Sequence, residues 1–271
     1  MDDATQPVTS AGISGLIPSI FPHPRTLLVS IIVPARNEES CVGDCLASLA
    51  SQTGIAGKID IEIEIIVVDD GSTDRTRVIA ESFAGVRVIN APPLPPGWIG
   101  KNNAVAAGAA IAQGEWLLFT DADTHHHPGS LHRALVEATH HGAQMLSYSP
   151  QQEVHGFWEQ AVMPVVFGEL AATYNPSEVS NPSSPAAAAN GQYLLITRAA
   201  YDAVGGHGAV ASELLEDVAL ARRVKAAGYK IFFRYAADAV RTRMYRSFSQ
   251  LKEGCIKNLA LLFPEIGRAH V

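Results

Sequence analysis

The sequence contains few cysteines, few charged residues and no long apolar run. Three cysteines among 271 residues are too few, and odd in number, to form a disulfide framework. Cys41 and Cys45 lie four residues apart on a predicted helix, where we expect small buried side chains. These features predict a reducing, cytoplasmic compartment.

Basic residues are in the minority, which excludes one class of partner. Lysine and arginine number 20 against 27 aspartates and glutamates, for a formal net charge of −7, and a general nucleic-acid binder needs the opposite balance. No stretch of about 18 residues is free of charged or strongly polar side chains, so no membrane-spanning helix is visible. The apolar share of 47% is enough to bury a core and argues against disorder.

The two ends of the chain differ from the rest. Residues 1–25 combine an acidic start with an apolar patch broken by proline; they lack the basic region of a signal peptide and predict a flexible N-terminal arm. The last seven residues, EIGRAHV (265–271), are what a common sequencing-adapter oligonucleotide encodes in frame. We therefore expect a non-native tail there, and one folded domain over residues 26–264.

Short apolar segments alternate with helical patterns from residue 27 to about residue 150. This alternation predicts an α/β fold whose mostly parallel central sheet carries helices on both faces. Ligands of such folds bind at the carboxyl ends of the strands. The expected strands are 27–33, 59–69, 86–89 and 116–120, and the expected helices are 39–50, 73–83, 102–113 and 130–141.

The second half of the chain is less regular, and we expect it to complete the site of the same domain. The sequence shows no internal repeat. The expected elements are a helical pattern over 157–174 interrupted at Pro164, a proline- and serine-containing loop over 175–185, strands at 192–197 and 231–234, and helices at 214–227 and 248–262.

Carboxylates follow two predicted strands and begin one predicted helix, at Asp69-Asp70, Asp121-Ala122-Asp123 and Glu216-Asp217. Asp121 and Asp123 are two residues apart after a buried strand and can both reach one point just outside the sheet. Mg²⁺ or Mn²⁺ prefers oxygen ligands and commonly keeps phosphate oxygens and waters. The pair therefore predicts a metal that bridges the protein to a diphosphate; the alternative is a turn in which the carboxylates accept backbone N–H groups.

Other polar residues lie near these carboxylates. Asp70, at a strand end, is well placed to accept hydrogen bonds from a base or a ribose, and Asp74 is expected to cap a helix. His125, His126 and His127 follow at once; one of them could add a metal ligand, but most are expected in a solvent-facing loop.

The segment PPLPPGWIGKNNA (92–104) opens a helix after Lys101. A helix N-terminus combined with a lysine favours phosphate. The segment has neither the P-loop pattern nor the G-x-G-x-x-G fingerprint, which removes support for an ATPase and for a dinucleotide-binding protein.

Positive charge is concentrated towards the C-terminus. Residues 222–257 hold ten basic side chains against Asp238 and Glu253, a local net charge of 10 − 2 = +8. A solvated helix face explains Arg222, Arg223 and Lys225. The arginines of RTRMYRS (241–247) suit a diphosphate or an anionic lipid.

Taken together, these motifs resemble glycosyltransferase family 2, the inverting, nucleotide-sugar-dependent transferases of the GT-A fold. The resemblance extends from about Ser30 to Pro264, and five motifs occur in the family's order: SIIVPARNEE, VVDDGSTD, GWIGKNNA, TDAD and LLEDVALARRVKAAGY. Within the family, GWIGKNNA, ANGQYLLI and RTRMYRS are similar to a membrane-associated branch that contains hopanoid- and carotenoid-associated transferases.

The resemblance implies a set of site residues and a bound Mg²⁺ or Mn²⁺. The resemblance implies that Pro34, Ala35, Glu38 and Asp70 hold the nucleoside and that Lys101 holds the diphosphate region. It implies that Asp121 and Asp123 hold the ribose-diphosphate and the metal, and that Asp217 is the general base. Arg243 matches the arginine of the family motif Q-x-x-R-W. Neither the glutamine nor the tryptophan of that motif, which processive members carry, is present. This departure favours a single transfer over polymer synthesis.

We expect an inverting hexosyltransferase that uses a nucleoside-diphosphate sugar, specifically a UDP-sugar, and a lipid or lipid-like acceptor. Peripheral membrane contact at the inner face of the cell membrane is assigned to residues 157–167 and the C-terminal basic helix, with core packing as the alternative for 157–167. Two other functions stay open, a sugar nucleotidyltransferase and a non-catalytic nucleotide-sugar binder. A nucleotidyltransferase normally has a glycine-rich loop near its first strand, and PARNEES (34–40) has no glycine.

Overall fold

The computed structural model describes residues 25–52, 59–154 and 174–243, together with Gly156, Gln160, Met163 and Gly168. The predicted arm before residue 25, the tail at 265–271 and the final helix at 248–262 lie outside the described residues, as does nearly all of the helical pattern at 157–174. No helix in the described ranges is long and apolar enough to cross a membrane.

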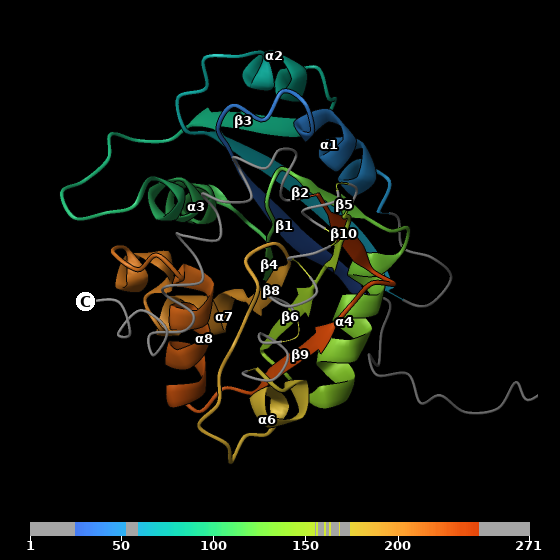
Figure 1. Ribbon diagram of the computed structural model, residues 1–271, viewed down its shortest axis with the longest axis vertical. Coiled ribbons are helices and arrows are strands. Elements are labelled where there is room, and N and C mark those ends of the chain that lie inside the picture. The colour runs from blue at the N-terminus through green and yellow to red at the C-terminus, as the bar shows by residue number, and fades with distance from the viewer. Residues whose placement is uncertain are drawn as a thin grey trace, which may run out of the picture.

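A seven-stranded sheet forms the centre of the molecule (Figure 1). Its neighbouring strands are parallel except at β8, which runs antiparallel to both β4 and β6. In spatial order the strands are β3 (Val86–Asn90), β2 (Ile59–Asp69), β1 (Arg25–Ala35), β4 (Trp116–Phe119), β8 (Leu194–Thr197), β6 (Met145–Ser149) and β9 (Ile231–Tyr235). The mostly parallel sheet predicted from the alternating segments is thus confirmed.

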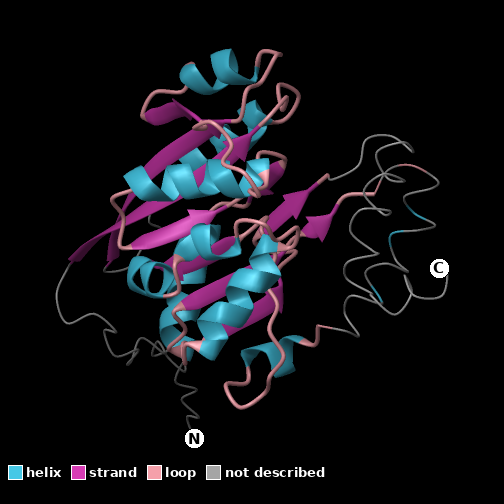
Figure 2. Cartoon of the chain, turned by 90° about the vertical axis from the view of Figure 1, so that its left-hand side faces the viewer, coloured by secondary structure: helices cyan, strands magenta, loops and turns pink. Residues whose placement is uncertain are grey.

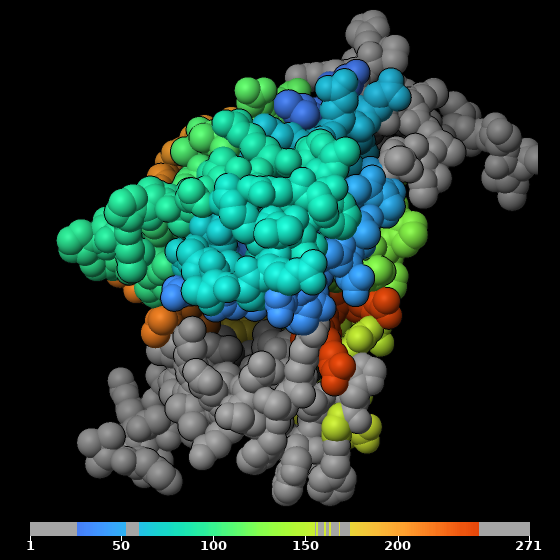
Figure 3. Space-filling model, turned by 90° about the horizontal axis from the view of Figure 1, so that it is seen from above, coloured from blue at the N-terminus to red at the C-terminus, as the bar shows by residue number. Residues whose placement is uncertain are grey.

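Helices cover both faces of this sheet (Figures 1 and 2). On one face lie α1 (Val42–Ala50), α2 (Thr76–Glu81) and α4 (Ser130–His141). On the other lie α3 (Gly100–Ile111), α6 (Pro176–Ser180), α7 (Arg198–Ala203) and α8 (Glu216–Ala226), with the 3-10 helix η1 (Gly206–Val210) beside α3 and α8. The loop between β3 and α3 projects from the body at the left of Figures 1 and 3.

The first strand is buried on both faces, as its β-branched, mostly apolar sequence predicts. Val29, Ile31 and Val33 are fully buried on the face of α1 and α4, and Ile32 is fully buried on the face of α3. Complete burial of each such side chain contributes about 1.5–3 kcal/mol relative to exposure. Gly108 of α3 allows close packing there, because a Cβ added to it would lie 2.6 Å from Ile32 Cγ2.

The structure contains elements that the sequence patterns did not predict. These elements are β6, α7, η1 and a second, small sheet. The small sheet consists, in spatial order, of β5 (Thr124–His126), β10 (Val240–Thr242) and β7 (Gln151–Gln152). The expected loop at 175–185 is wrong in part, since α6 occupies its first half. Pro176 takes the first helical position and Asn175 Oδ1 accepts the Ser177 N–H at 2.9 Å, which is a local helix-start pattern.

Three strand ends meet at one edge of the central sheet. The last residues of β1 and β2, Ala35 and Asp69, are paired in register, and the Asp70 N–H donates to the Ala35 carbonyl oxygen at 2.9 Å. β4 lies on the other side of β1 and ends at Phe119. Because parallel strands end together, the polar residues after β2 and β4 are brought to the same edge.

Candidate active site

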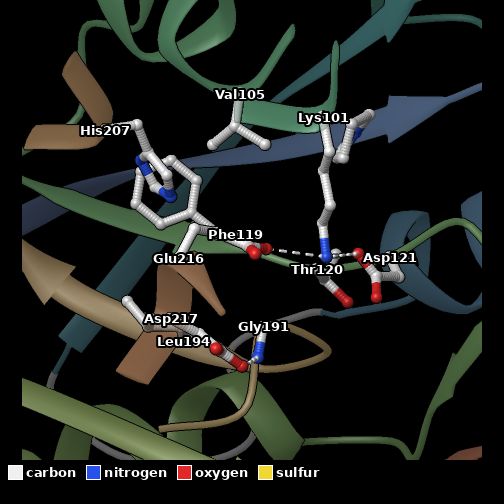
Figure 4. Close-up of a pocket in the computed structure, with 11 residues that line it drawn as sticks. Lys101, Val105, Phe119, Thr120, Asp121, Gly191, Leu194, His207, Glu216 and Asp217 are labelled. Carbon is white, nitrogen blue, oxygen red and sulfur yellow. Dashed lines mark hydrogen bonds and ion pairs between the residues drawn. The ribbon is translucent and has the colours of Figure 1, made fainter. Parts of the chain in front are cut away.

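A cleft lies at this edge, between the end of β4, the first turn of α3 and the start of α8 (Figure 4). About 260 Å³ of space, part of it open to solvent, lies within it. The residues that line this central cleft are Pro34, Lys101, Val105, Phe119, Thr120, Asp121, Gly191, Leu194, His207, Glu216 and Asp217. Four residues predicted from the sequence, Pro34, Lys101, Asp121 and Asp217, are therefore brought together.

Lys101 joins two of the carboxylate motifs. Its Nζ lies 2.9 Å from Asp121 Oδ1 and 3.0 Å from Glu216 Oε1 (Figure 4). Burial of the Lys101 ammonium opposes its charge, but the neighbouring carboxylates of Asp121 and Glu216 outweigh burial and hold the pKa of Lys101 well above its usual range. A permanent positive charge thus stands between the strand end and the start of α8.

Asp217 is held by backbone groups at the start of α8. Its Oδ2 accepts the Gly191 N–H at 2.8 Å, and its Oδ1 accepts the N–H of Val218 at 2.7 Å. Burial, followed by the charge of Glu216, raises the pKa of Asp217 to about 7, against the opposing effect of Lys101 and of the two N–H donors. A carboxyl group with a pKa near neutrality can exchange a proton with a substrate at physiological pH.

Asp123 has an incomplete environment. Its Oδ1 is buried and has no hydrogen-bond partner among the described residues, and burial, with the charges of Asp121 and Glu38, raises its pKa to about 7. A cation beside this oxygen would supply the missing partner, and the carboxylates of Asp121 and Asp123 are the hard oxygen donors that Mg²⁺ and Mn²⁺ prefer. Within the described ranges, no group of three or more His, Cys, Asp or Glu side chains is arranged to hold a metal ion.

The residues predicted for the nucleoside lie around the ends of β1 and β2. Asp70 Oδ2 is 3.6 Å from Arg36 Nη1 and lies next to the start of α3, where a Cβ added to Gly100 would come within 3.0 Å of it. Glu38 Oε2 accepts the thiol of Cys41 at 3.0 Å. Ala35 is buried in the core and offers no side chain to the cleft.

The predicted cap of the second helix is close to the observed arrangement. Arg75 immediately precedes α2, but Asp74 Oδ1 accepts the N–H of Thr76, the first helical residue, at 2.9 Å. Asp74 Oδ2 also accepts the Glu39 N–H at 3.1 Å. The carboxylate therefore ties the chain after β2 to the chain after β1.

The expectation of a solvent-facing loop at residues 125–127 is wrong for the middle histidine. His126 lies in β5 and is buried; its Nε2 is 3.0 Å from Thr120 Oγ1 and 3.2 Å from Thr124 Oγ1. Burial, reinforced by His125 and His127, lowers the pKa of His126 to about 3, so the ring is neutral. Pairing of β5 with β10 causes this burial, and nothing in the local sequence specifies that pairing.

The basic residues have more specific partners than a solvated helix face requires. Arg222 and Arg223 are exposed, but Arg223 Nε donates to the Val204 carbonyl oxygen at 3.2 Å. Lys225 Nζ donates to the Val179 carbonyl oxygen at 2.8 Å, which ties α8 to α6.

The two arginines at the end of β10 differ from each other. Arg241 pairs with Glu153 at 2.9 Å. Arg243 follows the strand and does not line the central cleft; its Nε is buried without a hydrogen-bond partner in the part of the chain that the structure describes.

Gly191, Asn102 and His207 help to shape the site and were not singled out from the sequence. Gly191 supplies an N–H to Asp217, and a Cβ added to it would lie 3.3 Å from Lys101 Nζ. Asn102 Nδ2 lies within 3.1 Å of the carbonyl oxygens of Val210, Ala211 and Glu213 and so holds the segment before α8. His207 forms part of the cleft wall. The local signals were two dipeptides typical of tight turns, Asn190-Gly191 and the Gly205-Gly206 that precedes His207.

Comparisons with known proteins identify relatives of this chain. The sequence is 29% identical over 241 residues to a 4,4'-diaponeurosporenoate glycosyltransferase of Staphylococcus haemolyticus, covering 87% of this chain and 62% of that protein. It is 28% identical over 244 residues to the Staphylococcus aureus protein of the same name, covering 86% of this chain and 60% of the relative. The chain thus spans about three fifths of the length of the curated relatives it matches.

Solved structures share the fold. The mannosyltransferase PcManGT of Pyrobaculum calidifontis, in complex with GDP-Man and Mn²⁺, superposes with a TM-score of 0.64 at 19% identity, over 92% of this chain and 67% of that one. Glucosyl-3-phosphoglycerate synthase of Mycobacterium tuberculosis, in complex with Mn²⁺ and UDP-glucose, gives a TM-score of 0.54 at 22% identity, over 89% and 79% of the two chains. These likenesses confirm the GT-A fold.

The family model described as "Glycosyl transferase family 2" matches residues 30–198. That stretch includes the second half of β1, the carboxylates after β2 and β4, Lys101 and the Gly191 backbone of the cleft. The chain therefore belongs to glycosyl transferase family 2.

Proposed function

We propose that this protein transfers a hexose from a nucleoside-diphosphate sugar to an acceptor hydroxyl, with inversion at the anomeric carbon. The observation that carries the proposal is the convergence on one cleft of Asp217, with a pKa of about 7, and Asp121, which Lys101 links to Glu216, the neighbour of Asp217 in the chain. Family membership supports the reaction class.

The donor would lie along the ends of β1, β2 and β4. Pro34 and Asp70 would flank the nucleoside, with Glu38 beside them, and Arg243, which lies outside the central cleft, would contact the donor from there. Lys101, at the first turn of α3, carries a positive charge suited to a diphosphate. Phosphate groups favour such a position because a helix N-terminus offers backbone N–H groups and a positive partial charge.

Asp121 and Asp123 would hold a divalent cation, Mg²⁺ or Mn²⁺. The buried, unpartnered Oδ1 of Asp123 supports this assignment, as does the Mn²⁺ in the mannosyltransferase and synthase complexes of the same fold. When bound, such an ion offsets the charge that grows on a departing diphosphate.

Asp217 would act as the general base. The acceptor oxygen forms a bond to the anomeric carbon as the bond from that carbon to the diphosphate oxygen breaks, and the acceptor proton moves to Asp217. Attack from the face opposite the diphosphate inverts the anomeric centre. The Gly191 and Val218 N–H groups orient the carboxylate for this transfer, and such a base contributes about 10²–10⁴-fold.

We further propose a UDP-sugar as donor and a lipid-like acceptor. Two relatives of this chain are named for a carotenoid substrate, 4,4'-diaponeurosporenoate, and solved proteins of the same fold are complexed with UDP-glucose or UDP-GlcNAc. An apolar acceptor would be presented at a membrane, so we place the reaction at the inner face of the cell membrane.

The test is transfer from labelled UDP-glucose, UDP-GlcNAc or GDP-mannose with Mn²⁺ and a lipid alcohol acceptor. A glycosyltransferase releases the nucleoside diphosphate, whereas a nucleotidyltransferase releases inorganic diphosphate. Asp217→Asn should lower kcat by about 10²–10⁴-fold with UDP affinity unchanged, and Asp202→Asn, at an exposed position of α7, is the matched control. Full activity of Asp217→Asn, or release of inorganic diphosphate, would contradict the proposal.

A further inference from the structure

His207 has a fixed orientation in the wall of the central cleft. It lies in η1, is 3% exposed and lines the cleft opposite the start of α8 (Figure 4). Its ring contacts Phe119 edge to face, with ring centroids 4.7 Å apart and an interplanar angle of 71°. None of the roles assigned above to donor, metal or base uses this side chain.

Tyr201 determines which nitrogen of His207 carries hydrogen. The Tyr201 hydroxyl oxygen accepts the backbone N–H of His207 at 3.1 Å and lies 2.9 Å from His207 Nδ1. Among the described residues, the Tyr201 hydroxyl has no hydrogen-bond acceptor other than His207 Nδ1. The hydroxyl therefore donates its hydrogen to Nδ1. A neutral imidazole that accepts at Nδ1 carries its hydrogen on Nε2.

The surroundings of His207 keep its imidazole ring neutral and allow Tyr201 to approach it closely. Burial, followed by the charge of Lys101, lowers the pKa of His207 to about 3, and burial raises the pKa of Tyr201 to about 12. Gly206 has φ +53°, and a Cβ added there would lie 2.5 Å from the Tyr201 ring. The glycine thus permits the approach of Tyr201 that fixes the histidine.

The cleft position indicates what the Nε2–H group meets. If the proposed function holds, displacement requires the anomeric carbon to lie between the diphosphate, near Lys101 and Asp121, and the base, Asp217. The sugar then occupies the space bounded by these residues, and His207 lines that same space. Val105, Phe119 and Leu194 line it as well and offer no hydrogen-bond donor.

We propose that His207 Nε2–H donates a hydrogen bond to a hydroxyl of the transferred sugar and makes His207 a specificity-determining residue of the donor site. This inference rests on the proposed function. A site built to pair with a hydroxyl leaves its donor unsatisfied when the hydroxyl is missing, and this cost discriminates against deoxy analogues.

Two amide substitutions at position 207 distinguish the roles of the two ring nitrogens of His207. The amide of His207→Gln reaches the position of Nε2, whereas that of His207→Asn reaches only the position of Nδ1. We expect His207→Asn to lower kcat/KM for UDP-glucose by about 10–100-fold with UDP affinity unchanged, and His207→Gln to keep most of the activity. UDP-glucose analogues that each lack one hydroxyl identify the hydroxyl that His207 binds. The wild-type enzyme should use one of these analogues much less well than UDP-glucose, whereas His207→Asn should use that analogue and UDP-glucose equally well.

Histidine ¹⁵N spectra of the wild-type chain provide a readout that needs no turnover, since a neutral ring protonated at Nε2 is expected. Protonation at Nδ1 would overturn the inference, as would an unchanged deoxy-sugar preference in His207→Asn or an equal loss of UDP affinity in both variants. If wild type transfers sugar and His207→Asn behaves identically, only this inference fails. If wild type binds UDP-glucose more tightly than UDP without transferring it, the proposed function fails, and calorimetry with the deoxy analogues still decides the role of His207.

Discussion

Removal of the Lys101 ammonium should destabilise the fold in a pH-dependent way. In Lys101→Met the aliphatic part of the side chain is retained, but Asp121 and Glu216 lose a partner at 2.9 and 3.0 Å. Breaking a buried ion pair costs ~3–5 kcal/mol, and exposed pairs contribute ~0.2–1 kcal/mol. The Lys101 side chain is 39% exposed and that of Glu216 is 10% exposed, so we expect a loss of about 2–3 kcal/mol at alkaline pH.

The sign of the pH dependence follows from Asp217. Its pKa of about 7 in the folded protein lies above the ordinary aspartate value of 3.8, so between these values the folded state binds more protons than the unfolded state. Stability from this group is therefore greatest at low pH and is lost as pH rises towards 7. Without Lys101, which favours the ionised form, the pKa of Asp217 in the folded state rises further. The destabilisation should be largest above neutral pH and smaller near pH ~5.

The assay is urea unfolding of wild type and Lys101→Met near pH ~5 and pH ~8.5, followed by circular dichroism with the m-values compared. Lys230→Met removes an exposed lysine and should change stability by less than ~0.5 kcal/mol at both pH values. Equal destabilisation of Lys101→Met at both pH values would show that packing, not charge, is responsible. No destabilisation at either pH would refute the structural role given to the ammonium.

Further predictions concern the base, the segment before α8 and the packing of α3. Because Asp217 must be ionised to accept a proton, kcat/KM should rise with pH through about 7, as a pH–rate profile would show; a flat profile from pH ~5 to ~8 would argue against this base. Asn102→Ala leaves carbonyl oxygens without their amide donor and should lower the free energy of unfolding by about 2–3 kcal/mol. Asn103→Ala, which removes one hydrogen bond to Pro92, should lower it less. Equal urea midpoints for the two variants would contradict the tethering role of Asn102. Gly108→Ala should lower the free energy of unfolding by about 1–3 kcal/mol through overpacking. Gly43→Ala in α1, where the added Cβ would lie 3.5 Å from its nearest neighbour, should be neutral or stabilising by up to ~1 kcal/mol. Thermal melts in which both variants behave alike would refute the close packing of α3.

The strands of the central sheet could be read from local patterns because burial on two faces demands long apolar runs. β1, β2 and β4 were predicted within a few residues, and the change in β2 from alternating to fully apolar matches its change from half-buried to buried. The small sheet could not be predicted. β7 has two residues, β5 and β10 have three each, and strands this short form only because distant segments pair.

The sequence by itself determined the fold class, the family and the presence of carboxylates after two strands and at the start of one helix. These are local features, because hydrophobic periodicity and motif order are written along the chain. Only the tertiary structure decided that Lys101 stands between Asp121 and Glu216, that Gly191 donates to Asp217, and that Tyr201 fixes His207. Residues far apart in the sequence supply these ion pairs and most of these hydrogen bonds. A side chain's pKa and tautomer depend on the neighbours and burial that folding provides, so the sequence shows which groups are available and the fold decides their chemistry.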